Sequence, residues 1–408
     1  MKTYLVGGAV RDKLLGLEPR ELDWVVVGGT PQDMLEAGYT QVGASFPVFL
    51  HPETKQEYAL ARTESKSGRG YHGFEVNFDP GVSLEQDLRR RDLTVNAMAM
   101  DDQGGLIDPF AGQVDLERRL LRHVSPAFSE DPLRVLRVAR FAARLADLGF
   151  TVAPETRDLM QGLSESGELD ALVPERVWQE LEKALNDAHP ARFIESLRDC
   201  GALAELWPEI HCLFGIPQSG RYHPEIDTGV HVLMTLDMAW SMQADVEVVF
   251  ACLMHDLGKG LTPKDVLPAH RGHELAGLPL VEAFCERTRA PARFRKLAMV
   301  VCEHHLRCHR VMEMKAKKVL HLVEAVGGLR NREQFDWFLL ACEADFRGRG
   351  GNTDAAYPQA GYLRQALEAT LAVSVADLAE RGLSGPQIAG ELHRRRVEAI
   401  GNEVVKPG

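Results

Sequence analysis

The chain has 408 residues, which is too long for one compact core, so its length predicts two to four domains. Hydrophobic residues make up 45% of the chain and charged residues 26%, as in ordinary globular enzymes. The net charge of −12 argues against a protein that coats nucleic acid, although a local basic groove can still attract an anionic partner. The seven cysteines are scattered without a CxxC pair, which favours free thiols over a disulfide framework or a thiolate zinc site.

Apolar runs in the sequence are far shorter than a membrane span, and the first residues lack the layout of a signal peptide. We therefore expect a cytoplasmic protein with no membrane partner. Residues 1–110 mix short β patterns with turns, and helical patterns dominate from about residue 115 onward. This order predicts an α+β fold, in which a small head with a mixed sheet precedes an all-helical remainder. The β patterns are TYLVGG (3–8), LDWVVVGG (22–29), FPVFLHP (46–52), QEYALAR (56–62), FEVNF (74–78) and GLIDPF (105–110).

The first β pattern leads into a glycine turn in the segment LVGGAVRDKLLG (5–16). We expect a strand that reaches Gly7 and Gly8, followed by a short helix that ends near Gly16. Such a turn lets the backbone approach a phosphate group, to which Arg11 could add a charge-assisted contact. The alternative interpretation is an ordinary tight turn between a strand and a helix.

Two carboxylates stand at the start of the second β pattern, RELDWVVVGG (20–29). The run after them is apolar and β-branched, which predicts a strand buried on both faces. Strand alternation points Glu21 and Asp23 to the same side, where two like charges need a cation. Such a pair suits Mg²⁺, which prefers carboxylate and phosphate oxygens. The alternative is a solvated strand end with Arg20 as the partner.

Arginines are concentrated in two later segments, DLRRRDLTVNAMAM (87–100) and SEDPLRVLRVARFAARL (129–145). The first segment places three arginines directly before Asp92. The second predicts a helix that opens near Asp131 and carries arginines at three-residue spacing on one face. We expect that face to be cationic, because no acidic residue follows until Asp147, although an ordinary solvated face is the alternative. The three arginines are Arg134, Arg137 and Arg140.

Histidine and aspartate recur on helical patterns in the second half of the chain. The segment VVFACLMHDLGKG contains the adjacent pair His255 and Asp256, and we expect Gly258 to end its helix. Imidazole and carboxylate together suit a borderline transition metal, whereas a lone histidine on an apolar face is usually a core residue. The order H…HD…D, completed by His231 and Asp345, favours a metal site.

Five motifs occur in order in the first part of the chain, and together they resemble a known family. The chain resembles the class II CCA-adding tRNA nucleotidyltransferases, which belong to the polymerase-β-like nucleotidyltransferases. Its histidine block resembles the HD-domain metal-dependent phosphohydrolases, so the whole chain is similar to the multifunctional bacterial form of the family. The motifs are GGxxR (7–11), carboxylate-x-Asp (21–23), RRDxTxNA (90–97), DPFxGxxDLxxxxLR (108–122) and EDPxRxLRxxRF (130–141).

The resemblance implies roles for the residues that match the motifs of the head. It also exposes a departure, because the family usually carries aspartate at the first strand position, where this chain has Glu21. The implied roles are Gly8 and Arg11 at the triphosphate, Glu21 and Asp23 at catalytic magnesium ions, Arg91, Arg137 and Arg140 at the incoming nucleotide, Asp92 near its ribose, and Asp131 with Arg134 as an amino-acid template for the base edges of CTP and ATP.

For the histidine block, the resemblance implies that His231, His255, Asp256 and Asp345 bind a transition metal, with nickel favoured. His273 and His304 could form a second set of ligands or could bind substrate phosphate, and Lys259 could steady a phosphate. The substrates implied are phosphate monoesters and 2′,3′-cyclic phosphodiesters.

The implied function is addition of the 3′-terminal CCA to tRNA from CTP and ATP, by a monomer or a homodimer. Two alternatives stay open, a bacterial poly(A) polymerase and an HD phosphohydrolase whose N-terminal part only binds nucleotide or RNA. The predicted divisions are a catalytic head (1–115), a helical neck and body with the base-recognition helix (116–225), an HD domain (226–329) and a helical tail that contacts tRNA (330–408).

Overall fold

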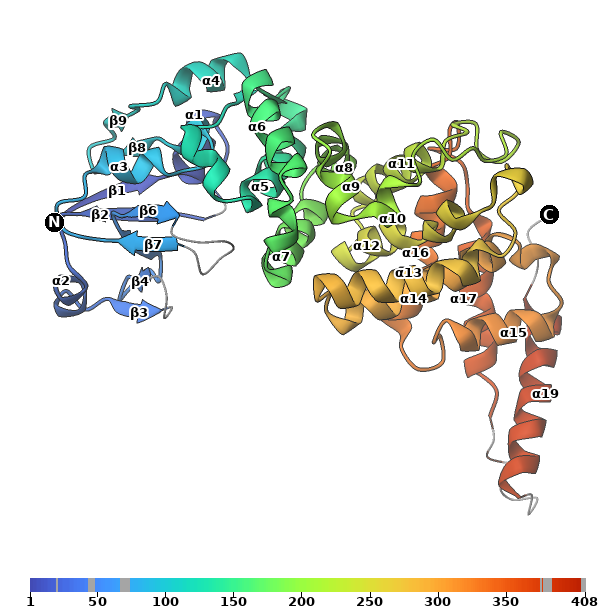
Figure 1. The fold of residues 1–408 in the computed structure, drawn as a ribbon. Coiled ribbons are helices and arrows are strands. Elements are labelled where there is room, and N and C mark those ends of the chain that lie inside the picture. Colours follow the sequence, from blue (N-terminus) through green and yellow to red (C-terminus); the bar gives the residue numbers. More distant parts are fainter. Residues whose placement is uncertain (20, 43–47, 67–73, 375, 377–383, 405–408) are drawn as a thin grey trace. The chain divides into compact units, whose positions relative to one another are not determined.

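The computed structural model describes residues 1–19, 21–42, 48–66, 74–374, 376 and 384–404. The chain forms two compact units (Figure 1). The first comprises Met1–Ala184 with Arg192–Leu206, and the second comprises Leu185–Ala191 with Trp207–Gly408. Among the described residues, no helix is both long and apolar enough to cross a membrane.

The first unit contains a mixed sheet of seven strands, in the order β3-β4-β5-β2-β1-β8-β9. Strand β2 pairs in parallel with β5, and the other neighbouring strands of this sheet run antiparallel. A separate hairpin consists of β6 (Thr63–Lys66) and β7 (Phe74–Asn77). The predicted mixed sheet is thereby confirmed. The strands of the large sheet are β1 (Lys2–Val6), β2 (Asp23–Val27), β3 (Thr40–Val42), β4 (Val48–Leu50), β5 (Glu57–Leu60), β8 (Ala99–Met100) and β9 (Leu106–Ile107).

Strand β2 lies inside this sheet and is covered on both faces, as its run of valines predicts. Val25 belongs to an apolar cluster that also contains Leu88, whereas its neighbour Val26 packs in a different cluster with Phe49. Successive residues of a strand point to opposite faces, so the two clusters cover the two sides of the sheet. The strand begins at Asp23. Glu21 therefore lies before the first residue that pairs with the neighbouring strands.

Helices flank the sheet and then make up nearly all of the remaining first unit. The predicted change from strands to helices is confirmed. The one addition is a short parallel pair of strands, β10 (Leu120–Leu121) and β11 (Thr151–Val152). The helix predicted to open near Asp131 begins at Leu133. The helices are α1 (Gly8–Leu14), α2 (Pro31–Glu36), α3 (Leu84–Arg89), α4 (Gly112–Arg118), α5 (Leu133–Arg144), α6 (Pro154–Glu165), α7 (Pro174–Asn186), α8 (Pro190–Asp199) and α9 (Ala202–Leu206).

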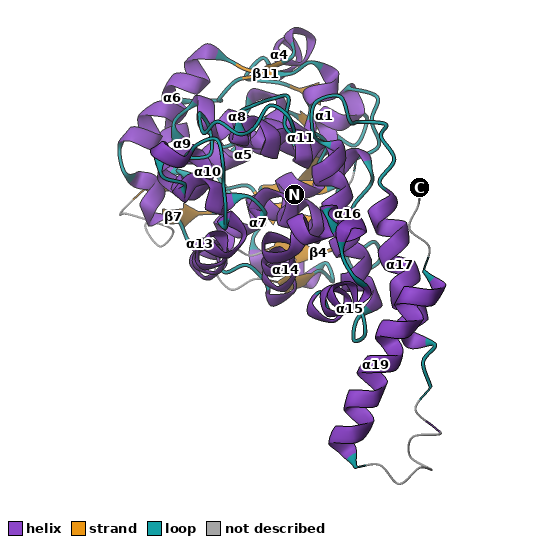
Figure 2. Cartoon of the chain, turned by 90° about the vertical axis from the view of Figure 1, so that its right-hand side faces the viewer, coloured by secondary structure: helices purple, strands orange, loops and turns teal. Residues whose placement is uncertain are grey.

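The second unit is built from helices (Figure 2). Helices α11, α12, α13, α14 and α16 pack on one another, and α15, α17 and α19 form a further group. Helix α19 begins after Ser384, which forms a capping box with Gln387. The helices are α10 (Pro208–His211), α11 (Thr228–Ser241), α12 (Val246–Met254), α13 (His273–Thr288), α14 (Ala292–His309), α15 (Ala316–Ala325), α16 (Arg332–Arg347), α17 (Pro358–Leu371) and α19 (Gly385–Glu403).

Candidate nucleotide and metal sites

The first candidate site lies where β1 and β2 meet the glycine turn. Asp23 opens β2 and pairs in register with Val6, the residue directly before that turn. Both Asp23 and Glu21 are exposed. Although Asp23 keeps accessible surface, surrounding protein atoms exclude part of the water around its carboxylate and raise its pKa; the Glu21 charge raises it further, whereas Arg91 and Arg137 lower it. The structure therefore gathers two carboxylates and two guanidinium groups within electrostatic range of one another.

The glycine turn fits closely against one of these arginines. Gly7 has φ of 71°, a conformation that favours glycine, and a Cβ there would lie 2.9 Å from Arg91 Nη1. Glu57 lies beside Asp23 in the β2–β5 register and adds a third carboxylate residue to this edge. No pattern in the sequence singles out Glu57, because only the strand pairing brings it beside Asp23. Arg20, the alternative partner for the carboxylate pair, lies outside the described residues.

Arg11, predicted at the triphosphate, is instead an interior side chain in this structure. It is 1% exposed, and its guanidinium donates to Asp12 Oδ1 at 2.7 Å and to Asn96 Oδ1 at 2.7 Å. Arg144 donates to the other oxygen of Asp12 at 2.8 Å. Gly8, predicted beside Arg11, is the first residue of α1 and is partly exposed. Arg11 thus ties α1 to the segment that carries Asn96.

Two of the three predicted arginines of α5 have acidic partners, so the expectation of a cationic face without such partners is wrong for Arg137 and Arg140. Arg137 donates to Asp92 Oδ2 at 2.8 Å, and Arg140 donates to Glu180 Oε2 at 2.6 Å. Burial would raise the pKa of Asp92, but the Arg137 charge and the amide of Asn96 hold it far below its ordinary value. These partners come from segments distant in sequence, which a helical pattern alone does not reveal.

The two predicted template residues likewise contact protein groups. Arg134 is 7% exposed and donates to the backbone carbonyls of Ala127 at 2.8 Å and Arg90 at 2.5 Å. Asp131 accepts from the backbone N–H of Leu133 at 3.1 Å. In this structure Arg134 therefore secures the arginine-rich segment before Asp92, and base pairing would require it to exchange these partners.

Asp12 is expected to be important for the stability of the first unit. Asp12→Ala leaves the buried Arg11 without its carboxylate, which costs about 3–5 kcal/mol in comparable buried pairs. Calorimetry of the full chain should show one transition lowered by roughly 10 °C. The exposed Asp102 provides the matched control, since Asp102→Ala should leave both transitions unchanged. Equal midpoints for the two variants would contradict the importance of the Arg11–Asp12 pair.

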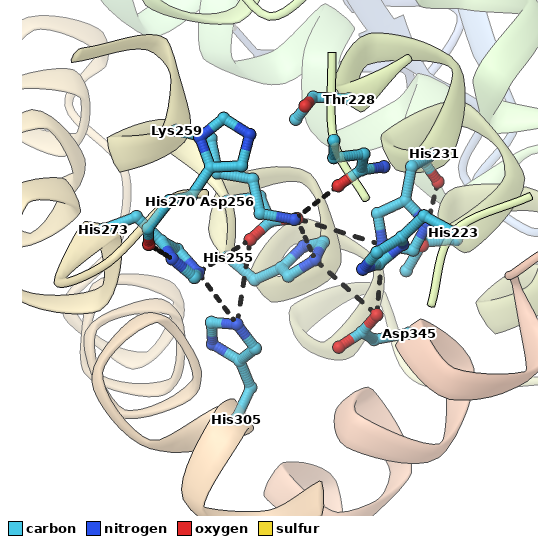
Figure 3. Close-up of polar contacts among 12 residues, drawn as sticks. His223, Thr228, His231, His255, Asp256, Lys259, His270, His273, His305 and Asp345 are labelled. Atoms are coloured by element: carbon cyan, nitrogen blue, oxygen red, sulfur yellow. Dashed lines mark hydrogen bonds and ion pairs between the residues drawn. The ribbon is translucent and has the colours of Figure 1, made fainter. Parts of the chain in front are cut away.

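The second candidate site lies among helices of the second unit (Figure 3). His231 on α11 places Nε2 at 3.0 Å from Asp345 Oδ1 on α16. His255, directly after α12, has Nε2 at 3.9 Å from that same oxygen and at 3.1 Å from Asp256 Oδ2. All four side chains are buried. The predicted residues of the H…HD…D order are therefore brought together in space.

A second cluster shares the carboxylate of Asp256. Its Oδ1 atom lies 3.2 Å from His273 Nε2 and 3.7 Å from His305 Nε2. Of the two histidines named from the sequence, the structure brings His273 to this cluster, whereas His305, and not its neighbour His304, faces Asp256. Adjacent residues of a helix point about 100° apart, and only the packing of α14 decides which one faces the site.

Gly258 does not end helix α12, which finishes at Met254. It lies in the following short turn, where an added Cβ would come within 2.0 Å of the His273 carbonyl oxygen. The absence of a side chain therefore lets the start of α13 approach Asp256 closely. This contact brings His273 into the second cluster.

The orientation of the four histidine rings fits a metal site. In each ring Nδ1 contacts a fixed oxygen, which leaves Nε2 facing the cluster interior. The buried Nε2 of His255 and Oδ1 of Asp256 have no hydrogen-bond partner. Mixed nitrogen and oxygen donors of this kind suit a transition metal. The contacts of Nδ1 are Glu225 Oε1 at 2.9 Å for His231, the Cys252 carbonyl at 2.7 Å for His255, the His270 carbonyl at 2.6 Å for His273, and the Val301 carbonyl at 3.0 Å for His305.

The charges of this second site also favour a bound cation. Burial would raise the pKa of Asp256, but His255 and Lys259 hold it well below its ordinary value. Burial opposes protonation of His255, yet the nearby carboxylates raise its pKa overall. Lys259 Nζ lies 2.6 Å from Asp256 Oδ2 and donates to Gln218 Oε1 at 2.7 Å. The site therefore attracts positive charge and holds one buried lysine beside it.

Comparisons with known proteins agree with this division into two sites. Three family models match the chain. The poly A polymerase head domain matches residues 3–122, the probable RNA and SrmB-binding site of polymerase A matches residues 149–213, and the HD domain matches residues 228–378. The last match extends past residue 329 and includes Asp345. A nucleotidyltransferase head combined with an HD unit defines the class of this enzyme.

Relatives and solved structures identify the family more closely. The chain is 61% identical over 400 residues to the multifunctional CCA protein of Thioalkalivibrio sulfidiphilus, which covers 98% of each chain. It is 56% identical to the multifunctional CCA protein of Hahella chejuensis, over 98% of this chain and 95% of the relative. The chain therefore belongs to the multifunctional CCA protein family, and the predicted resemblance is confirmed.

Solved structures agree on the fold. The Bacillus stearothermophilus CCA-adding enzyme in complex with CTP has a TM-score of 0.66 at 24% identity, covering 98% of this chain and 89% of that one. The Thermotoga maritima CCA-adding enzyme complexed with tRNA has a TM-score of 0.66 at 19% identity, covering 100% of this chain and 88% of that one. The predicted fold class is thus confirmed.

Proposed function

We propose that the first unit adds and repairs the 3′-terminal CCA of tRNA from CTP and ATP without a nucleic-acid template, releasing pyrophosphate. The observation that carries this proposal is Asp23 at the start of β2, beside Glu21, Arg91 and Arg137. Relatives named multifunctional CCA proteins, over nearly the full chain, support the same activity.

The residues of the first site suit a hard divalent ion, because exposed carboxylate oxygens are the donors that Mg²⁺ prefers. Glu21 and Asp23 would hold it, and a bound ion would activate the attacking 3′-hydroxyl and neutralise the leaving pyrophosphate. Arg91 and Arg137, whose charges act on Asp23, would orient the triphosphate. Asp131 and Arg134 would select cytosine and adenine, since a carboxylate accepts from the exocyclic amine that both bases carry.

Incubation with tRNA that lacks its terminus tests this proposal against its alternatives. With Mg²⁺, we expect CTP and then ATP to be incorporated, and extension to stop after three nucleotides in total. A long ladder with ATP alone would instead support a poly(A) polymerase. Absence of incorporation with any nucleoside triphosphate would leave a nucleotide-binding head attached to a hydrolase.

For the second unit we infer a metal-dependent phosphohydrolase that acts on 2′,3′-cyclic phosphodiesters, 2′-nucleotides and phosphate monoesters. The two clusters that contain Asp345 and Asp256 support this activity, and Lys259, whose Nζ lies 2.6 Å from Asp256 Oδ2, would contact a phosphate. His231, His255, Asp256 and Asp345 would hold a transition metal, nickel by family resemblance. A bound metal would supply a water of lowered pKa. Hydrolysis of 2′,3′-cyclic AMP should require added Ni²⁺ and should stop on chelation, whereas activity without any metal would contradict the assignment.

We also propose a cytoplasmic location, which suits an enzyme acting on tRNA, with the tail from residue 330 onward as a tRNA contact. The chain is either a monomer or a homodimer. Light scattering of the purified protein with and without tRNA distinguishes these two states.

A further inference from the structure

His309 lies beside the histidine and aspartate site of the second unit and is not one of its proposed metal ligands. His309 is the last residue of α14, and its side chain is only 10% exposed. Its Nε2 atom lies 2.6 Å from Asp345 Oδ2, and its Nδ1 atom lies 2.8 Å from the hydroxyl of Tyr357. Both contacts are short, and they join three separate segments at one carboxylate.

The two oxygens of Asp345 therefore have different surroundings. Oδ1 faces His231 Nε2 at 3.0 Å and His255 Nε2 at 3.9 Å, whereas Oδ2 is in contact with His309 (Figure 3 shows one oxygen turned toward the histidines and the other away). Arg349 donates to both oxygens, at 3.1 and 3.3 Å, so it does not distinguish between them. His309 contacts Oδ2 alone and therefore makes the two oxygens of Asp345 different.

His309 Nε2 also lies 3.2 Å from Arg349 Nη2, which donates to the same carboxylate, and the tautomer of His309 follows from its contacts with Asp345 and Tyr357. A carboxylate can only accept, so Nε2 carries a proton and donates to Asp345. In the neutral ring Nδ1 then accepts from the Tyr357 hydroxyl, which is 7% exposed. The Tyr357 hydroxyl also lies 3.4 Å from Cys308 Sγ, so it is held at a fixed position. Tyr357 thereby fixes the ring of His309, and His309 fixes the carboxylate.

We propose that His309 is a positioning residue, which holds Oδ2 of Asp345 and reserves Oδ1 for the metal of the hydrolase site. The inference rests on the metal site proposed above. Hydrogen-bonded groups behind a metal ligand typically change metal affinity by about 10- to 100-fold when they are removed. His231 has a comparable neighbour, because its Nδ1 lies 2.9 Å from Glu225 Oε1 while its Nε2 faces Asp345.

The test is equilibrium dialysis of the full chain against a series of free Ni²⁺ concentrations, with bound metal measured by mass spectrometry. We expect His309→Ala to weaken Ni²⁺ binding by about 10- to 100-fold. His309→Gln keeps an N–H donor and should recover part of the affinity. Tyr357→Phe keeps the ring and loses only the hydroxyl, so a smaller loss is expected.

His321, an exposed histidine on α15, gives the matched control, because His321→Ala should bind Ni²⁺ like the unmodified chain. Nucleotide addition by the first unit confirms that each chain is folded there, and a melting curve checks the second unit. If His309→Ala is unstable, His309→Gln and Tyr357→Phe decide the outcome. Affinities equal to that of His321→Ala in these variants would overturn the proposal.

Asp345→Ala separates failure of this inference from failure of the metal site. Equal Ni²⁺ binding by Asp345→Ala and the unmodified chain would show that the proposed site does not bind metal there. Loss of Ni²⁺ in Asp345→Ala, with unchanged binding in His309→Ala, would instead refute only the positioning role.

Discussion

Replacement of Asp23 by asparagine is expected to lower the rate of nucleotide addition by roughly a thousandfold or more. A bound metal stabilises the charge of the transition state by several kcal/mol, and each 1.36 kcal/mol corresponds to about a factor of ten. The amide keeps the size of the side chain but removes the charge that faces Arg91 and Arg137. Single-turnover incorporation of labelled CTP into tRNA lacking its terminus measures the effect.

Two comparisons make this result specific. Hydrolysis of 2′,3′-cyclic AMP by the same Asp23→Asn chain should be unchanged, because that site lies in the other unit. Alanine in place of the exposed Glu18 should leave addition intact. A variant Asp23→Asn that adds CTP at the normal rate would contradict the proposed site.

Substitutions of Glu21 test whether the second carboxylate also holds the ion. Glu21→Asp should preserve or raise addition, since it restores the residue that the family usually carries, whereas Glu21→Ala should lower it. Unchanged addition in Glu21→Ala would show that Glu21 does not hold the ion and leave Asp23 and Glu57 as the carboxylates to test.

Asp256→Asn is expected to abolish the phosphohydrolase activity and to remove metal from both clusters of the second unit. One oxygen of Asp256 faces His255 and the other faces His273 and His305, so a single carboxylate serves both groups. The loss should reach roughly a thousandfold in the rate of hydrolysis, for the same reason as in the first unit. Bound Ni²⁺ and hydrolysis of 2′,3′-cyclic AMP are the two measurements.

His273→Ala provides the informative comparison for Asp256→Asn. It removes a ligand from only one cluster, so it should lower the metal content less than Asp256→Asn does. Nucleotide addition should continue in both variants. Equal metal loss in the two variants would contradict the sharing of Asp256, and full hydrolysis by Asp256→Asn would contradict the assignment of the site.

Much of the fold could be predicted because the relevant signals are local. The run of valines after Asp23 indicates a strand covered on both faces, and Ser384 with Gln387 marks the start of α19. The adjacent pair His255 and Asp256 also stood out, because two polar groups at the end of an apolar helix need partners. Each of these features depends on neighbours within a few residues.

The remaining features depend on packing between distant segments. Arg140 meets Glu180 across 40 residues, so the helical pattern of α5 could not show that this arginine is paired. His304 and His305 are equivalent in a linear sequence, and only the rotation of α14 selects the second. The buried residues Val301 and Cys308 lie one turn from both His304 and His305, so the apolar face of that helix does not distinguish the two histidines either.

The long separation between His231 and Asp345 has a consequence for the folding of the second unit. These two residues are 114 positions apart, yet they meet at one point, so an ion held between them closes a large loop of chain. An ion that binds only the folded form adds about 2.7 kcal/mol of stability when its concentration is a hundred times its dissociation constant. With the proposed ion bound, the stability of this unit would therefore depend on the metal concentration, as it would depend on a removable cross-link.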